Sequence, residues 1–328
     1  MRLLVIGGTR FVGRAVVEAA LRAGHDVTLF NRGRTAPGLY PDAETVVGDR
    51  TADLAPLAGR AFDTVIDCAG YQPEVVRISA TALKNSVDRY VFVSTVSVYA
   101  DQSVPADESS AVLDDDSYGG RKARCERVVI DAYGERALIA RPGLIVGPHD
   151  PTERFPHWPR RLARGGRVLV PGAPEDPMQL IDVRDLGNWL VAADVTGVFN
   201  AVGPTLPMRD LIEACTTKEA GTTKEAGTTK EAGTTKETND AELVWVPTAT
   251  LLEAGVDPWM GVPMWIGDPE AAAANLVSGE RARQAGLVTR PVRETAADVL
   301  AWDIARGGPT DDPFPAEAEE KLLSRVSG

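Results

Sequence analysis

The chain begins with a strand, a glycine-rich turn and a helix, and this order restricts its fold more than any other feature. An apolar strand is predicted over Leu3–Ile6, and the run GGTRFVG follows at residues 7–13. Apolar residues then recur at helical spacing up to Gly24, and a second strand is predicted over Asp26–Phe30. This order is typical of a parallel α/β sheet in which the amides at a helix N-terminus bind a dinucleotide pyrophosphate.

A tyrosine and a lysine lie one helical turn apart, at Tyr118 and Lys122, where the pattern predicts a helix from Ser117 to Tyr133. Their side chains would project from the same helix face. A lysine ammonium beside a phenol lowers the pKa of the phenol, which suits proton exchange with a substrate oxygen. The spacing arises by chance too often to identify a site alone.

Two hydroxyl groups end a further buried strand, predicted over Tyr90–Thr95. The carboxyl end of a strand is where ligands bind in open parallel sheets. Thr95 therefore joins Tyr118 and Lys122 as a candidate for the same site.

In this order the motifs resemble the extended or atypical short-chain dehydrogenases/reductases, which are epimerase/dehydratase-like. The resemblance extends from Met1 to about Gly203, and more loosely to about Arg306. It implies a Rossmann-type doubly wound parallel sheet with a smaller C-terminal substrate-binding lobe. Besides the glycine loop, the matching segments are Asp49 after VVG, Cys68-Ala69-Gly70 after the strand Thr64–Asp67, VSTVSVYA at 93–100, YGGRK at 118–122, RPGLIVGP at 141–148 and LIDVRDL at 180–186.

The resemblance also implies roles for individual residues. Thr95 would hydrogen-bond the substrate oxygen and Tyr118 would be the acid/base, while Lys122 would hold the nicotinamide ribose and tune Tyr118. Asp49 would meet the adenine. The residues expected to bind the cofactor are Gly7, Thr9, Arg10, Phe11, Val12, Gly13, Asn31, Arg32, Arg34, Asp49, Arg50, Cys68, Ala69, Gly70, Lys122 and Pro142.

Departures from the family pattern bear on the cofactor. Arg10 stands where the glycine loop usually has Gly, and Asn31 stands where NAD-users carry an Asp for the ribose hydroxyls. With Arg32 and Arg34 nearby, a 2′-phosphate would meet attraction instead of repulsion. The sequence therefore favours NADP(H), with NAD(H) as the alternative; the bland interpretation is that these arginines are solvated surface charge.

Other departures bear on the substrate. Val96 and Ser97 replace the Asp-Glu pair of sugar-nucleotide 4,6-dehydratases, and Leu144 and Met178 replace an Asn and a phosphate-binding Arg of sugar-nucleotide epimerases. These changes favour a small or moderately apolar substrate. Side chains that could line its site, or could equally be ordinary core, are Leu144, Trp158, Met178, Trp259, Met260, Met264 and Trp265.

The leading hypothesis is an NAD(P)-dependent oxidoreductase that transfers a hydride to or from a carbonyl or secondary alcohol, with Tyr118 as acid/base. A sugar (nucleotide) epimerase of the same family is the first alternative. The second is a non-redox cofactor-binding or RNA-binding protein, because GGTRFVG with VTLFNRGRT at residues 27–35 also resembles the chloroplast stem-loop RNA-binding proteins.

Charge and cysteine content limit the classes of partner and ligand that the chain is expected to bind. A net charge of −12 argues against nucleic acid, because phosphate backbones bind basic faces. Cys68, Cys125 and Cys215 have no metal-type spacing, so we expect no metal site and a reducing cytoplasm. No apolar run approaches the ~20 residues of a membrane span, and because the chain opens on a predicted strand we expect no signal peptide. The expected partner is a small-molecule substrate, with a homodimer as a candidate assembly.

Two domains are predicted: a dinucleotide-binding domain over 1–150 and 177–203, and a substrate lobe over 151–176 and 204–306, followed by a tail at 307–328. Helices are predicted over Met208–Ala214, Glu294–Ala305 and Pro315–Val326, and a strand over Leu243–Val246. Residues 216–237 repeat TTKEAG, and a period of six spreads equivalent residues over three helix faces. We expect this repeat to be an exposed loop expansion, which costs little entropy.

Overall fold

The computed structural model describes residues 1–52, 54–216, 241–309 and 311–326. It divides into two compact units: unit 1 is Met1–His149, Pro177–Thr205 and Pro269–Arg290, and unit 2 is Asp150–Asp176, Leu206–Asp268 and Pro291–Gly328. After Thr216, the TTKEAG repeat lies outside the described residues. The segment 269–290, which the sequence assigned to the substrate lobe, falls in unit 1, and the division of labour between domains stays a prediction.

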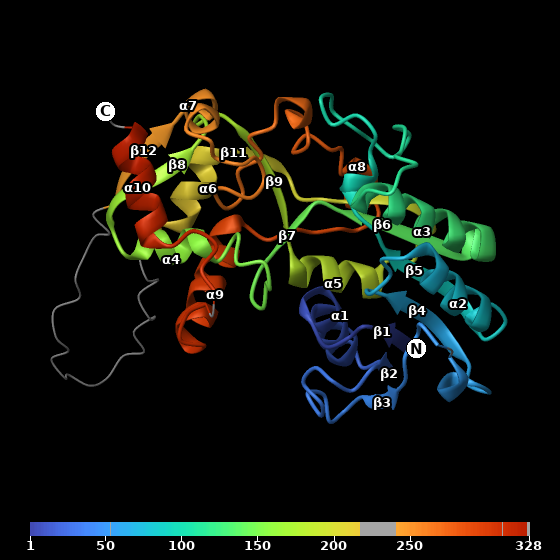
Figure 1. Ribbon diagram of the computed structural model, residues 1–328. Helices are drawn as coiled ribbons and strands as arrows, with labels where there is room; N and C mark the ends of the chain where they lie inside the picture. The colour runs from blue at the N-terminus through green and yellow to red at the C-terminus, as the bar shows by residue number, and fades with distance from the viewer. Residues whose placement is uncertain (53, 217–240, 310, 327–328) are drawn as a thin grey trace, which may run out of the picture. The chain divides into compact units, whose positions relative to one another are not determined.

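Unit 1 is built on a seven-stranded parallel sheet in the order β10-β6-β5-β4-β1-β2-β3 (Figure 1). The order reverses between β1 and β4, so the carboxyl ends of these two strands flank a topological switch point, where ligands bind in doubly wound sheets. The predicted fold class is confirmed. The strands are β1 (Arg2–Ile6), β2 (Asp26–Asn31), β3 (Glu44–Val47), β4 (Phe62–Asp67), β5 (Val87–Val93), β6 (Ala137–Pro142) and β10 (Gly197–Ala201).

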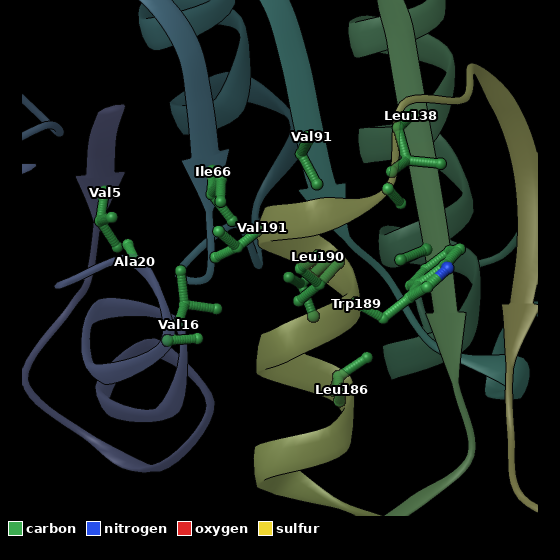
Figure 2. Close-up of a cluster of buried hydrophobic side chains, with 14 of the residues drawn as sticks. Val5, Val16, Ala20, Ile66, Val91, Leu138, Leu186, Trp189, Leu190 and Val191 are labelled. Atoms are coloured by element: carbon green, nitrogen blue, oxygen red, sulfur yellow. The ribbon is translucent and has the colours of Figure 1, made fainter. Parts of the chain in front are cut away.

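Helices pack on both faces of this sheet because successive strand residues point to opposite sides. In β1, Val5 joins a core cluster with α1 (Phe11–Arg22) and α5 (Val183–Ala192), whereas Leu4 joins the cluster of α2 (Pro73–Leu83) and α3 (Tyr118–Tyr133). Figure 2 shows the first cluster. Its labelled side chains are Val5, Val16, Ala20, Ile66, Val91, Leu138, Leu186, Trp189, Leu190 and Val191.

The remaining elements of unit 1 are short. Strand β7 (Leu144–Val146) pairs in parallel with β9 (Pro177–Asp182). The others are the 3-10 turns η1 (Ala55–Leu57), η2 (Val96–Val98), η3 (Gly134–Arg136) and η4 (Pro269–Ala271), helix α8 (Glu280–Gln284), and β11 (Thr205–Pro207), whose last two residues belong to unit 2.

Unit 2 contains a two-stranded parallel sheet, β8 with β12, and five helices within its described residues. Glu319 of the last helix anchors it, because its carboxylate accepts hydrogen bonds from the Leu169 amide and the Arg161 guanidinium. The sequence-predicted elements α6, β12, α9 and α10 are confirmed. The elements are α4 (His157–Ala163), β8 (Gly166–Pro171), α6 (Met208–Cys215), β12 (Ala241–Val246), α7 (Thr248–Glu253), α9 (Val292–Ala305) and α10 (Ala316–Val326).

Candidate active site

The glycine loop brings the start of α1 onto the end of β1. Gly7 has a φ of +86°, and a Cβ on Gly13 would lie 2.0 Å from the Gly7 carbonyl oxygen, so neither position accepts a larger residue without movement. Arg10 is the N-cap of α1, and its side chain makes no capping hydrogen bond within the described part of the chain. The amides and the positive dipole end of α1 are therefore available to an anion such as a pyrophosphate.

The loop after β4 passes close to the glycine loop. A Cβ on Gly7 would lie 2.7 Å from the Ala69 Cβ, and a Cβ on Gly70 would lie 2.4 Å from the Phe92 ring. Cys68 is half-buried, and burial raises the pKa of its thiol. The two loops thus meet at the switch point with the close backbone approach that a dinucleotide needs.

Arg50 lies inside the protein rather than at its surface. Its guanidinium forms a two-point ion pair with Asp67, with Nη1–Oδ1 at 2.7 Å and Nη2–Oδ2 at 2.8 Å. Asp67 also accepts hydrogen bonds from the Tyr90 hydroxyl and the Ala69 amide. Burial acts to raise the pKa of Asp67, but Arg50 and Tyr90 hold it below its usual value. Arg50 therefore supports the 68–70 loop through Asp67.

The ends of β2 and β3 carry exposed charges. The Asn31 side chain accepts a hydrogen bond from the Gly33 amide at 2.7 Å, and Arg32 and Arg34 are exposed. Asp49, also exposed, accepts hydrogen bonds from the amide and hydroxyl of Thr51. These bonds, and then the charges of Arg32 and Arg34, lower the pKa of the Asp49 carboxyl. The acid and the two arginines are thus close enough to interact.

Thr95 lies just beyond β5, which ends at Val93, two residues before the predicted end of the strand. It is the N-cap of η2. Its Oγ1 accepts a hydrogen bond from the Ser97 amide at 3.1 Å and lies 3.1 Å from the Ser97 hydroxyl. This cap turns the chain, so the Thr95 hydroxyl stays at the carboxyl end of the sheet.

Two glycines at the start of α3 allow close packing: Gly119 lies against η2, and Gly120 lies against the loop that precedes the helix. A Cβ on Gly119 would lie 2.0 Å from the Ser97 carbonyl oxygen, and one on Gly120 would lie 2.2 Å from the Asp115 carbonyl oxygen. The first turn of α3 therefore lies directly against η2. Two adjacent glycines at a helix start, where helix propensity disfavours them, are the signal that could have revealed this contact.

Tyr118 is 48% exposed, and its phenol interacts with its neighbours. Partial burial raises the pKa of the phenol, Tyr71 adds to the rise, and a hydrogen bond with Thr95 opposes it. The net shift is upward, burial is its largest cause, and Lys122 is not among the groups that produce it. The expectation that Lys122 tunes Tyr118 stays a prediction.

Lys122 is only 3% exposed, and its ammonium donates hydrogen bonds to the Gly70 oxygen at 2.7 Å and the Val93 oxygen at 2.6 Å. It also lies over the Phe92 ring, 4.2 Å from the centroid, and 5.5 Å from the centroid of Tyr71. Burial lowers the pKa of Lys122 to about 8. Lys122 thus joins the loop after β4 to the end of β5.

Tyr71 is a further residue that the sequence analysis missed. It follows Cys68-Ala69-Gly70 directly and is exposed, yet its phenol interacts electrostatically with Cys68, Arg10 and Tyr118. An aromatic residue directly after the close-approach loop was the available signal. Pro142, in contrast, is buried at the end of β6, where it pairs with Ala201 of β10.

The candidate substrate-lining residues divide by burial. Trp158, Met178, Met264 and Trp265 are buried core, Leu144 is half-buried, and Trp259 and Met260 are exposed. Among the described residues, no group of three or more His, Cys, Asp or Glu could hold a metal ion. None of the described helices has the length and apolar character needed to cross a membrane.

Comparison with known proteins gives a family match and several distant relatives. The model of the NAD dependent epimerase/dehydratase family matches residues 3–84 and 74–197. The 3-beta-hydroxysteroid dehydrogenase of Mycolicibacterium neoaurum is 30% identical over 199 residues, which cover 52% of this chain and 54% of that protein. The chloroplast stem-loop binding protein of 41 kDa b of Arabidopsis thaliana is 28% identical, covering 57% of this chain and 53% of that protein. The chain thus spans about half the length of these two relatives.

A third relative is aligned over more of its length. The 2-alkyl-3-oxoalkanoate reductase of Stenotrophomonas maltophilia is 29% identical, covering 65% of this chain and 74% of that protein. Among solved structures, the UDP-glucuronic acid 4-epimerase of Bacillus cereus in complex with NAD has a TM-score of 0.65 at 16% identity and covers 93% of this chain and 99% of that one. At this identity the likeness concerns the fold alone.

Proposed function

Because the chain is an enzyme of the NAD dependent epimerase/dehydratase family, we propose that it transfers a hydride between a nicotinamide cofactor and the carbonyl or secondary alcohol of a small or moderately apolar substrate. The resemblance seen in the sequence is thereby confirmed at the level of the family. The observation that carries the proposal is that α3 lies with its first turn, which contains Tyr118, against η2, which Thr95 caps, while Lys122 of the same helix binds the Val93 oxygen at the end of β5.

A bound nicotinamide would supply or accept the hydride at the substrate carbon. In the reducing direction, Tyr118 would give its phenolic proton to the substrate oxygen as the carbonyl becomes an alcohol, and Thr95 would orient that oxygen by a hydrogen bond. Lys122 has three N–H donors, of which two bind the Gly70 and Val93 oxygens. The third would be left for the nicotinamide ribose.

The proposed cofactor site rests on the backbone around Gly7, Gly13 and Gly70. Each of these positions excludes a Cβ because protein atoms lie in close contact, so the glycines let the two loops pack together beside the N-terminus of α1, where a pyrophosphate would bind. Cofactor contacts from the other residues named in the sequence analysis are part of this proposal.

We further propose a preference for NADP(H). Arg32 and Arg34 are exposed beside Asn31, which carries no charge to repel a 2′-phosphate. Asp49 interacts with both arginines and offsets part of their attraction, so we expect a moderate preference. Dissociation constants for NADPH and NADH, measured by fluorescence, test this proposal. Tenfold tighter binding of NADH, about 1.4 kcal/mol in the wrong direction, would refute it.

The names of two relatives, a hydroxysteroid dehydrogenase and an oxoalkanoate reductase, support carbonyl/alcohol chemistry. The second candidate function is epimerisation of a sugar nucleotide. It is favoured by fold neighbours such as the UDP-N-acetylglucosamine 4-epimerase of Bacillus cereus. RNA binding, suggested by the name of the stem-loop binding relative, ranks below both because of the net charge of −12. A homodimer stays a prediction.

Turnover of a panel of ketones and secondary alcohols with NADPH and NADH tests the first proposal. UDP-sugars assayed for C4 inversion test the second, and a gel shift with structured RNA at physiological salt tests the third. Oxidoreductase activity that depends on Tyr118 is the expected result. Inversion of UDP-sugars without turnover of any panel member would replace the proposal with the epimerase.

A further inference from the structure

A buried ion pair lies on the same face of α3 as Tyr118 and Lys122. Glu126 follows Lys122 by one helical turn and Tyr118 by two, so the three side chains share a helix face. Glu126 is 3% exposed and Arg141 of β6 is 5% exposed. The Arg141 Nε lies 3.0 Å from Glu126 Oε1, and its Nη2 lies 2.6 Å from Oε2. These hydrogen bonds join α3 to the central sheet.

Glu126 also holds the segment that contains Thr95. The hydroxyl of Ser94, the residue directly before Thr95, donates a hydrogen bond to Glu126 Oε1. The Ser94 amide donates to the oxygen of Ala140, the residue directly before Arg141, at 2.7 Å. One carboxylate of α3 therefore contacts both the residue after β5 and a residue of β6.

The far end of η2 is tied to the same ion pair. Arg141 Nη1 donates a hydrogen bond to the hydroxyl of Tyr99, the residue directly after η2, at 3.1 Å. The Tyr99 hydroxyl in turn donates to Asn200 Oδ1 of β10 at 2.7 Å. Thr95 thus lies in a short segment that is bound at both ends: Glu126 binds Ser94, and Arg141 binds Tyr99.

The charge of Glu126 acts on Lys122 as well. Asp67 and Glu126 oppose the effect of burial on the pKa of Lys122, while Arg50 adds to it. Arg50 pairs with Asp67, so each acid near Lys122 has an arginine partner. The charged or titratable groups that face Lys122 are Arg50, Asp67, Cys68, Tyr71, Cys125 and Glu126.

We propose that Glu126 is a positioning residue, whose carboxylate sets Thr95 relative to Tyr118 and Lys122. Its negative charge, one helical turn from Lys122, also favours the ammonium form of that lysine. The inference rests on the proposed function, in which these three residues act on substrate and cofactor. Glu126 itself exchanges no proton with the substrate.

The experiment compares Glu126→Gln with the double variant Glu126→Gln/Arg141→Met. The single change leaves Arg141 buried without a counter-charge, which is expected to destabilise the fold, whereas the double change removes both charges together. In the double variant, we expect kcat to fall on the order of tenfold to 10²-fold with KM little changed. The pKa of Lys122, followed by carbon-13 NMR of ε-labelled lysine and assigned with Lys122→Arg, should fall, because Glu126 is among the groups that raise it whereas Arg141 is not among the groups that shift it.

A matched control uses another buried Arg–Glu pair, Arg161 with Glu319 in unit 2, at 2.5 Å. The double variant Arg161→Met/Glu319→Gln should lower the thermal midpoint while kcat and the Lys122 titration keep their native values. The inference is overturned if the Glu126/Arg141 variant keeps both its kcat and its Lys122 pKa. It is equally overturned if the control lowers kcat by the same factor, because general destabilisation would then explain the loss.

The NMR titration separates this inference from the proposed function, because it needs neither substrate nor cofactor. If the pKa of Lys122 is unchanged in the Glu126/Arg141 variant, the proposed effect of the Glu126 charge is wrong, even if the enzyme is an active oxidoreductase. If Tyr118→Phe keeps full activity, the proposed function is wrong, independently of the result for Glu126.

Discussion

The two ends of the proposed cofactor site, both in unit 1, are built in different ways. At the nicotinamide end, Lys122 is buried and bound to two carbonyl groups, and Gly119 brings α3 against η2. At the adenosine end, Arg32, Arg34 and Asp49 are exposed. Buried groups keep their geometry and interact strongly, whereas exposed charges move and are screened by salt. The contrast suggests that reaction geometry is fixed by packing, while cofactor choice is left to adjustable surface charge.

The largest effect on turnover is expected at the nicotinamide end, from removing one hydroxyl group. Tyr118→Phe removes only the hydroxyl that would exchange the proton, and we expect turnover to fall by at least ~10²-fold with cofactor affinity nearly intact. Tyr133→Phe is the matched control at the other end of the same helix, because the buried Tyr133 hydroxyl has no hydrogen-bond partner among the described residues. Steady-state kinetics of both variants test whether Tyr118 is the acid/base. Equal activity of the two variants would show that it is not.

Lys122→Met should reduce both turnover and cofactor affinity, with a loss of stability as well. The change leaves the buried Gly70 and Val93 oxygens without the ammonium that binds them, at about 1–3 kcal/mol for each unsatisfied group. Kinetics, cofactor titration and thermal unfolding measure the three effects. A variant that loses stability but keeps its cofactor affinity would make Lys122 a structural residue alone.

The contact of α3 with η2 can be tested separately from the chemistry. Gly119→Ala places a Cβ 2.0 Å from the Ser97 oxygen, so we expect a cost of about 1–3 kcal/mol and a lower kcat as Tyr118 moves from Thr95. Gly24→Ala is the control, since its Cβ meets no described atom within 4 Å but its φ of +73° opposes alanine. Both variants should unfold at lower temperature, and only Gly119→Ala should lose turnover.

The fold could be predicted from the sequence more fully than the contacts of the candidate site. Strand and helix periodicity located β1, α1, β5 and α3, because these elements are defined by local apolar patterns. The burial of Arg50 against Asp67 and the ties from Glu126 to Ser94 and Arg141 were not predicted. They join residues distant in sequence, and nothing local distinguishes a buried arginine from an exposed one. The raised pKa of Tyr118 was not predicted either, because it comes mainly from burial, which depends on contacts between residues distant in sequence.

At the adenosine end, Arg32→Ala/Arg34→Ala should weaken NADPH binding while NADH binding changes little. The arginines are exposed, so each contributes as a screened surface charge, and together we expect a loss on the order of tenfold at low salt. Cofactor titrations at low and high ionic strength measure the effect. The loss should shrink as the salt concentration rises, and a loss that salt leaves unchanged would contradict a surface-charge origin.

The smallest effect is expected from Asp49→Asn, which keeps the size of the side chain and its acceptor for the Thr51 amide and hydroxyl. The change removes the negative charge that interacts with Arg32 and Arg34, so both arginines become more available to a 2′-phosphate. We expect NADPH to bind roughly two- to fivefold more tightly at low salt, as for one exposed charge pair, with NADH affinity nearly constant. Weaker binding of both cofactors by Asp49→Asn would show instead that the carboxylate contacts the adenosine directly. The adenosine end would then hold the cofactor by a specific side-chain contact, as the nicotinamide end is proposed to do.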